Sequence, residues 1–214
     1  MIYTQEEKLR DVFRKNAETL LPPDIPLDVS LNLYNVRVFE KDGEIKAFIN
    51  SIEFPYGKEI EFAYSKRNDF EGNLFLLEEI NKLTESGDVY YTVWEHNENM
   101  MKIARKISTL MLKGYVWTVS NPDIEFNKNL VPFVVSYGKG EDLVFNGSYL
   151  SMYFNLGNLD YSFVNRMMEK YRIPYFVIYY PAPDLRFKYY RFSFFRVIPE
   201  RIKAYIKMYR KVMK

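Results

Sequence analysis

The stretch AYSKRNDFEGNLFLLEEINKL, residues 63–83, holds the residues best suited to chemistry. A strand-like run ends there in a short polar loop, and an amphipathic helix begins near Gly72. The open N–H groups and positive dipole end of a helix N-terminus suit a phosphate, and a glycine lets a ligand approach the backbone. Arg67 can add a charge-assisted hydrogen bond. The stretch therefore predicts an anion site, with an ordinary strand-to-helix turn as the alternative, and the residues assigned to the site are Arg67, Asn68, Phe70, Gly72 and Asn73.

A second candidate for chemistry is a metal-dependent nuclease site. Glu44 and Lys46 form an E-x-K pattern on a predicted strand, with Asp42 upstream, and carboxylates with a lysine can hold a divalent metal. Asp42-Gly43 is better explained as a hairpin turn, because this dipeptide stands between two alternating runs. The chain has no cysteine and a single histidine, His96, which excludes thiolate sites, disulfides and two-histidine metal sites. We therefore expect no metal site.

The bulk composition is typical of a globular protein. The 214 residues suffice for one large domain or two small ones, and 48% of them are hydrophobic and 27% charged. No run of about 18 apolar residues is present, so we expect no membrane span. The first residues do not combine a basic region with an apolar run, so we expect a cytoplasmic protein.

Charge is distributed unevenly along the chain. Residues 161–214 hold 13 Lys and Arg against three acidic residues, a net charge of +10, so the first 160 residues carry −8 of the overall +2. Such an asymmetry favours a polyanionic partner, and attraction between the two halves of the chain is the alternative.

Hydrophobic periodicity and turn residues predict an alternation of helices and strands. Thr4 and Glu7 form a capping box for the first helix, and Asp42-Gly43 marks a hairpin. The expected helices are 4–20, 72–84, 97–112, a helix at 160–172 capped by Asp160, and 199–214. The expected strands are the hairpin 35–54 and the segments 58–65, 87–95, 114–120, 131–137, 149–154, 175–180 and 187–198.

The order of elements over residues 4–120 resembles the GNAT family of N-acetyltransferases. VFEKDGEIKAFI resembles the family's strand pair, and EIEFAYSKRNDFEGNLFLLEEI resembles its central strand, pyrophosphate loop and helix. Arg67 and Gly72 stand at the first and last places of the loop pattern R/Q-x-x-G-x-G/A, whereas Phe70 replaces the first glycine. VYYTVWEHNENMMKIARKI resembles the next strand and the Asn-containing turn at Asn97, and LKGYVWTV resembles the step that follows.

The resemblance implies an α+β fold with a mixed, mostly antiparallel sheet flanked by helices. We expect residues 1–120 to form the GNAT-like domain, and residues 121–214 to form a basic, aromatic-rich α/β extension or a second small domain.

The resemblance also implies transfer of an acyl group from acetyl-CoA, or another acyl-CoA, to an unidentified amine. The pyrophosphate would bind the loop after Arg67, with Asn97 at the next turn. Glu61 or Glu95 would act as the base, and Tyr64 would protonate the thiolate, with Tyr90 and Tyr91 as alternatives. Ala104 stands where the family often places its tyrosine.

A catalytically inactive GNAT-like protein is the alternative function. Residues 186–214 interleave Arg and Lys with aromatic residues. Basic groups neutralise phosphates and aromatic faces stack on unpaired bases, so this region predicts a nucleic-acid or acidic partner. The same aromatic residues could instead fill a core.

Overall fold

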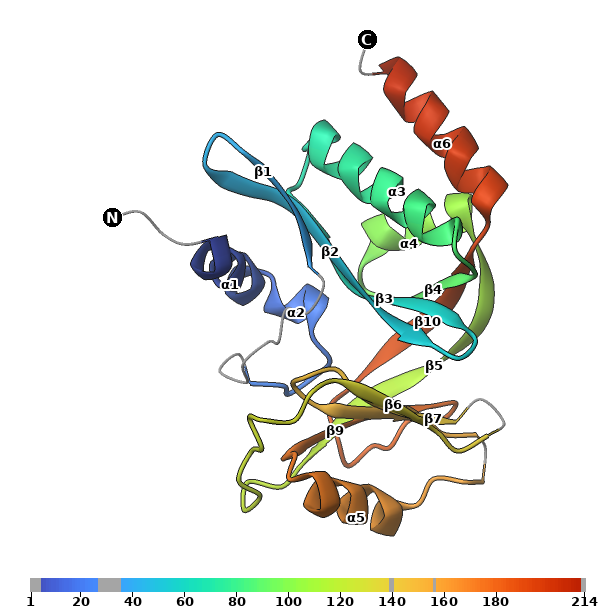
Figure 1. The fold of residues 1–214 in the computed structure, drawn as a ribbon. Helices are drawn as coiled ribbons and strands as arrows, with labels where there is room; N and C mark the ends of the chain where they lie inside the picture. The colour runs from blue at the N-terminus through green and yellow to red at the C-terminus, as the bar shows by residue number, and fades with distance from the viewer. Residues whose placement is uncertain (1–4, 27–35, 139–140, 156, 213–214) are drawn as a thin grey trace. The chain divides into compact units, whose positions relative to one another are not determined.

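The computed structural model describes residues 5–26, 36–138, 141–155 and 157–212 (Figure 1). The chain forms two compact units, and both are discontinuous in sequence. The first unit comprises residues 1–20, 33–112 and 193–214, and the second comprises residues 21–32 and 113–192.

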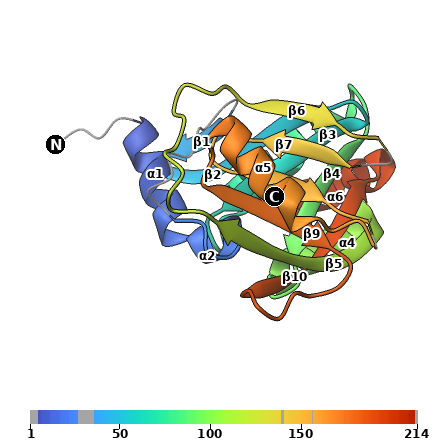
Figure 2. The ribbon, with the colours of Figure 1, turned by 90° about the horizontal axis from the view of Figure 1, so that it is seen from below.

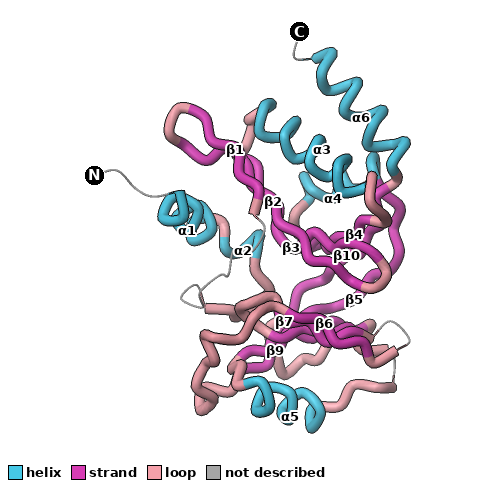
Figure 3. Tube along the Cα trace, viewed as in Figure 1, coloured by secondary structure: helices cyan, strands magenta, loops and turns pink. Residues whose placement is uncertain are grey.

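The first unit is built on a mixed sheet with the strand order β1-β2-β3-β4-β10-β5 (Figure 3). Asp42 and Gly43 both have positive φ, as a tight hairpin turn between the first two strands requires. β1–β2 and β2–β3 pair antiparallel, whereas β3–β4 pair in parallel. The strands are β1 Arg37–Lys41, β2 Glu44–Phe54, β3 Gly57–Ser65, β4 Val89–Trp94, β5 Ser108–Ser120 and β10 Tyr189–Val197.

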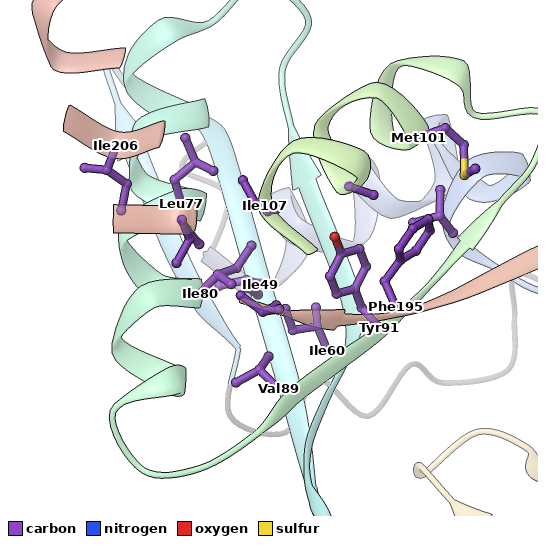
Figure 4. Close-up of a cluster of buried hydrophobic side chains, with 14 residues drawn as sticks. Ile49, Ile60, Leu77, Ile80, Val89, Tyr91, Met101, Ile107, Phe195 and Ile206 are labelled. Atoms are coloured by element: carbon purple, nitrogen blue, oxygen red, sulfur yellow. The ribbon is translucent and has the colours of Figure 1, made fainter. Parts of the chain in front are cut away.

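Helices pack on both faces of this sheet. On one face, Phe13 of α1 stacks on Phe48 of β2 and meets Phe62 of β3 edge-on. On the other face, α3, α4 and α6 share one hydrophobic cluster with the sheet, in which Ile206 of α6 lies beside Leu77 of α3 (Figure 4). The helices of this unit are α1 Gln5–Lys15, α2 Ala17–Leu20, α3 Phe70–Thr84, α4 Glu98–Ile107 and α6 Pro199–Val212.

The second unit has the strand order β10-β5-β9-β8-β7-β6, with α5 packed against β9 (Figure 2). Its core is aromatic and aliphatic, and Trp117 and Phe176 are fully buried in it. Asp160 caps α5 as predicted, since its carboxylate accepts the N–H of Ser162. The elements found only here are β6 Phe133–Ser136, β7 Asp142–Phe145, β8 Leu150–Tyr153, α5 Tyr161–Tyr171 and β9 Tyr175–Tyr180.

The predicted fold class, α+β with a mostly antiparallel mixed sheet, is confirmed, but two predicted helices are wrong in extent. The helix predicted over 4–20 breaks at Asn16, whose side chain donates to Val12 O and whose N–H turns back to Phe13 O. The helix predicted over 97–112 ends at Ile107, where the carbonyl accepts the N–H of Ile198 and β5 begins. Thr4, the expected cap, lies outside the described residues.

Two further features differ from the expected organisation. β7, a strand of four residues between the segments expected as strands at 131–137 and 149–154, was not predicted. The compact units do not divide at residue 120: residues 193–214 return to the first unit, because Phe195, Ile202 and Ile206 are buried in its cluster. Among the described residues, no helix is long and apolar enough to span a membrane.

Gly72 provides a test of how α3 packs on the sheet. A Cβ added at Gly72 would lie 3.0 Å from Lys46 O and from Ser65 Oγ. The Lys46 carbonyl cannot retreat easily, since it accepts the N–H of Lys66 at 2.7 Å. We predict that Gly72→Ala lowers the free energy of unfolding by about 1 kcal/mol in urea titrations, although alanine normally stabilises a helix. Asn73→Ala, as the control, should change it by less than about 0.5 kcal/mol, and stabilisation by Gly72→Ala would contradict the packing described.

Candidate functional site

The central feature of the site is a β-bulge at Glu61. Asn50 pairs with Phe62 and Ser51 pairs with Ile60, so Glu61 is an extra residue on β3. The buried side chain of Asn50, 4% exposed, uses both of its polar atoms at this bulge. Its Oδ1 accepts the N–H of Phe62 at 2.9 Å, and its Nδ2 donates to Glu61 Oε2 at 3.1 Å. The bulge therefore fixes the position of one carboxylate on the central strand.

The parallel pairing of β3 with β4 stops at the same place. It covers only Lys58↔Val89, Glu59↔Tyr90 and Ile60↔Tyr91, although β3 continues to Ser65 and β4 to Trp94. Pairing with β2 persists to the last residue of β3. From Glu61 onward, β3 is therefore held by a ladder on its β2 side and has no ladder to β4.

Glu61 and Tyr64, two of the predicted catalytic residues, lie on the face of β3 that carries the aromatic cluster of α1. Tyr64 stacks on its cross-strand partner Phe48 at 5.4 Å between ring centroids. Glu61 contacts Asn50, which shares the face of Phe48 because side chains alternate along β2. Both side chains are half-buried. The structure thus brings a carboxylate and a phenol to one face.

Glu95, the other predicted base, follows directly after the last residue of β4. It is half-buried and accepts a 3.4 Å hydrogen bond from Ser193 Oγ of β10, whereas the neighbouring His96 is exposed. Glu95 thus lies beyond the end of β4, next to β10, and Glu61 lies on β3.

The alternative tyrosines have other roles. Tyr91 is buried in the hydrophobic cluster, its hydroxyl lies 2.6 Å from Ser108 Oγ, and burial raises its pKa well above the usual value. Tyr90 stacks on Phe194 and donates to Asp88, and burial is again the main cause of its raised pKa. Tyrosines that hold their protons this tightly inside packing contacts are poor general acids. Ala104 is fully buried in the cluster.

The N-terminus of α3 is capped by the protein itself. Asp69 is the N-cap, and its Oδ1 accepts the N–H of Gly72 at 2.8 Å. The N–H of Asp69 donates a hydrogen bond to Lys66 O, and the N–H of Asn73 donates one to Asp69 O. Two of the amides expected to face a phosphate, those of Gly72 and Asn73, therefore have acceptors within the chain, and the cap adds a negative charge.

Other residues of the predicted anion loop also have structural roles. Asn68 adopts the left-handed conformation, with φ 62°, at the turn. Gly72 is buried against β2 and β3, where an added Cβ would be in tight contact with Lys46 O and Ser65 Oγ. Phe70 is 53% exposed, with its ring 5.8 Å from that of Tyr209. Arg67 is exposed and remains available to an anion. The loop as a whole fits a diphosphate poorly.

Asn97, the predicted residue at the next turn, caps α4 in the same way, because its Oδ1 accepts the N–H of Met100 at 3.2 Å.

The Glu44 carboxylate of the nuclease hypothesis accepts hydrogen bonds from Lys46 at 2.7 Å and from Lys66 at 2.8 Å, and these hydrogen bonds lower its pKa to about 2. The described residues contain no cluster of three potential metal-ligating acidic, histidine or cysteine side chains. The E-x-K pattern is therefore explained as a surface ion pair.

Comparison with known proteins gives structural neighbours only. No protein-family model and no curated protein matches the chain. A candidate acetyltransferase from Thermoplasma acidophilum is 14% identical, with a TM-score of 0.48, over 87% of this chain and 88% of that one. A GCN5-related N-acetyltransferase from Sphaerobacter thermophilus is 8% identical, with a TM-score of 0.44, over 87% and 84% of the two chains. The likeness concerns the course of the chain and not its activity.

Two residues on which the site depends, Asn50 and Asp69, were not among the predicted site residues. Asn50 stands inside the apolar run AFINSIEF, and a lone amide in such a run is a signal for a buried polar contact. Asp69 stands three residues before Gly72, at the N-cap position of a helix that begins at Phe70. The predicted start near Gly72 placed Asp69 in the loop and concealed this role.

Two substitutions of Asp69 distinguish the hydrogen bond of the N-cap from the negative charge of its carboxylate. Alanine cannot accept the Gly72 N–H, so we predict that Asp69→Ala lowers the free energy of unfolding by about 1 kcal/mol. Asparagine is an equally good N-cap, so Asp69→Asn should stay within about 0.5 kcal/mol of the unsubstituted chain. Urea titration of both variants measures the difference. Equal losses in the two variants would contradict the hydrogen-bonded cap and indicate a purely electrostatic role.

Proposed function

We propose that the chain transfers an acyl group from an acyl thioester of the coenzyme A type to an amine. The proposal is supported by one observation above all: the β3–β4 ladder ends at the bulge that fixes Glu61. A strand edge without a ladder can pair with the amide groups of an extended ligand, as added strands do in peptide recognition. The pantetheine arm of coenzyme A carries two such amides.

Residues around the bulge have distinct roles in this proposal. Glu61 would accept the proton that the attacking amine loses, since a half-buried carboxylate that the bound amine can hydrogen-bond is a suitable base. Asn50 is a positioning residue, because its amide holds Glu61 through Nδ2 and the backbone of the bulge through Oδ1. Tyr64, on the same face, is the phenol assigned to the departing thiolate. The thioester supplies the activated acyl group.

Coenzyme A fits the two parts of this region unequally. The β3 edge suits the arm, but the α3 N-terminus does not suit the diphosphate, because Asp69 caps it and Glu71 adds a further carboxylate. Glu71 binds Lys41 at 2.5 Å. Arg67, the cation of the predicted anion loop, is exposed and could pair with a phosphate. We therefore assign most of the binding free energy to the acyl-pantetheine part.

The two candidate bases are distinguished by paired substitutions. We predict that Glu61→Gln lowers kcat by about 10²-fold or more, with little change in KM for acetyl-CoA, because glutamine cannot accept the amine's proton. Glu95→Gln should lower kcat by less than about fivefold, because the proposal assigns the general base to Glu61 and not to Glu95. Because the chain has no cysteine, release of free thiol from acetyl-CoA with a panel of primary amines reports the product without background. The reverse ranking of the two variants would assign the base to Glu95.

Comparison of acetyl-CoA with acetyl-pantetheine tests whether the diphosphate part of the donor contributes to binding. Ligands that bind the folded state raise Tm by mass action, so we predict similar rises with acetyl-CoA and with acetyl-pantetheine at equal concentration. Binding of the diphosphate at the N-terminus of α3 would instead make acetyl-CoA bind at least about tenfold more tightly than acetyl-pantetheine. No rise with either thioester at millimolar concentration would contradict the proposed function itself.

A further inference from the structure

A groove of about 710 Å³ lies along the C-terminal half of α3, against α6. These two helices pack directly on each other in the first unit (Figure 1). Ile206 is the apolar residue among those lining the groove, and the remaining lining residues are polar or charged. They are Glu78, Asn81 and Lys82 of α3, Glu85 directly after α3, and Lys203, Lys207, Arg210 and Lys211 of α6.

Cations are in excess in this groove, and three of them form a row. Lys203, Lys207 and Lys211 repeat every fourth residue, so they follow one side of α6 at intervals of about 6 Å. In the described part of the chain, no ion pair joins any of the three to an acidic residue. In contrast, Arg210 binds Glu78 at 2.6 Å and Lys82 binds Glu79 at 2.5 Å. The lysine row is therefore available to an external anion.

Other cations of the basic C-terminal region are already engaged. Arg186 binds Asp184 at 2.6 Å, Arg196 approaches Asp88 at 3.7 Å, and Arg201 donates to the Ser108 carbonyl at 3.0 Å. Part of the positive charge predicted for the end of the chain is thus neutralised within the chain, whereas the lysine row on α6 is exposed.

The chemistry of the groove favours a peptide over a nucleic acid. Glu78 and Glu85 line it and would repel a chain that carries a phosphate on every unit. None of the described residues that line it is aromatic, so bases would find no ring to stack on. Met208 and Val212 of α6, which directly follow Lys207 and Lys211 in the chain, are 48% and 71% exposed and offer apolar contacts. A peptide with spaced carboxylates and apolar side chains matches both features.

We propose that this groove docks an acidic segment of a partner protein, with its carboxylates along Lys203, Lys207 and Lys211. A helical segment with an acidic residue at every fourth position would match the row in spacing and in sign. The site consists of α3 and α6 residues other than those of the bulge, so the proposal goes beyond acyl transfer and does not depend on it.

The test is fluorescence anisotropy of the full chain with a labelled helical peptide that carries glutamate at every fourth position. Lys203→Gln/Lys207→Gln/Lys211→Gln should weaken binding by about tenfold or more at low ionic strength. The control variant Lys15→Gln/Lys128→Gln/Lys170→Gln removes the same charge from exposed positions elsewhere and should change binding by less than about twofold. Circular dichroism melts of both variants verify that they fold, which is expected because all six lysines are exposed.

Three results would overturn the proposal. Equal weakening in the groove and control variants would indicate attraction by net charge alone. Tighter binding of a single-stranded oligonucleotide, lost in the groove variant, would assign the row to nucleic acid. No binding of the acidic peptide by the unsubstituted chain at low ionic strength would leave the groove without the proposed occupant.

Discussion

The buried side-chain amide of Asn50 is the contact around which the first unit's central strands are arranged. A buried amide with an unpaired atom costs about 1–3 kcal/mol, so its two partners are strongly favoured. Asn50 finds them in the Phe62 N–H and the Glu61 carboxylate, and this requires β3 to carry one residue more than β2. The bulge, the placement of Glu61 and the loss of pairing to β4 all occur at this position.

The same unit closes one expected ligand site while it leaves another accessible. At α3, the Asp69 carboxylate accepts from an amide that an anion would need, and Gly72 packs closely against the sheet. At β3, the ladder to β4 is missing over the residues that follow Ile60. A donor recognised through its amides rather than its phosphates is consistent with both features, and the donor specificity should reflect this.

Local signals predicted much of the fold and only part of the site. The Asp42-Gly43 turn, the Asp160 cap and the central strand carry their information within a few residues, so the sequence was sufficient to locate them. The bulge at Glu61 depends on the register between two strands, and alternation along one strand cannot reveal an extra residue. The end of α4 at Ile107 likewise depends on pairing with a segment some ninety residues away, at Ile198.

Amide hydrogen exchange along β3 is the most direct test of the central claim that the strand edge beyond Ile60 receives the donor. With saturating acetyl-pantetheine, the account predicts increased protection of amides within residues 61–65, while the β1–β2 hairpin stays unchanged. Unchanged exchange in residues 61–65, with protection appearing instead at the first turn of α3, would contradict it.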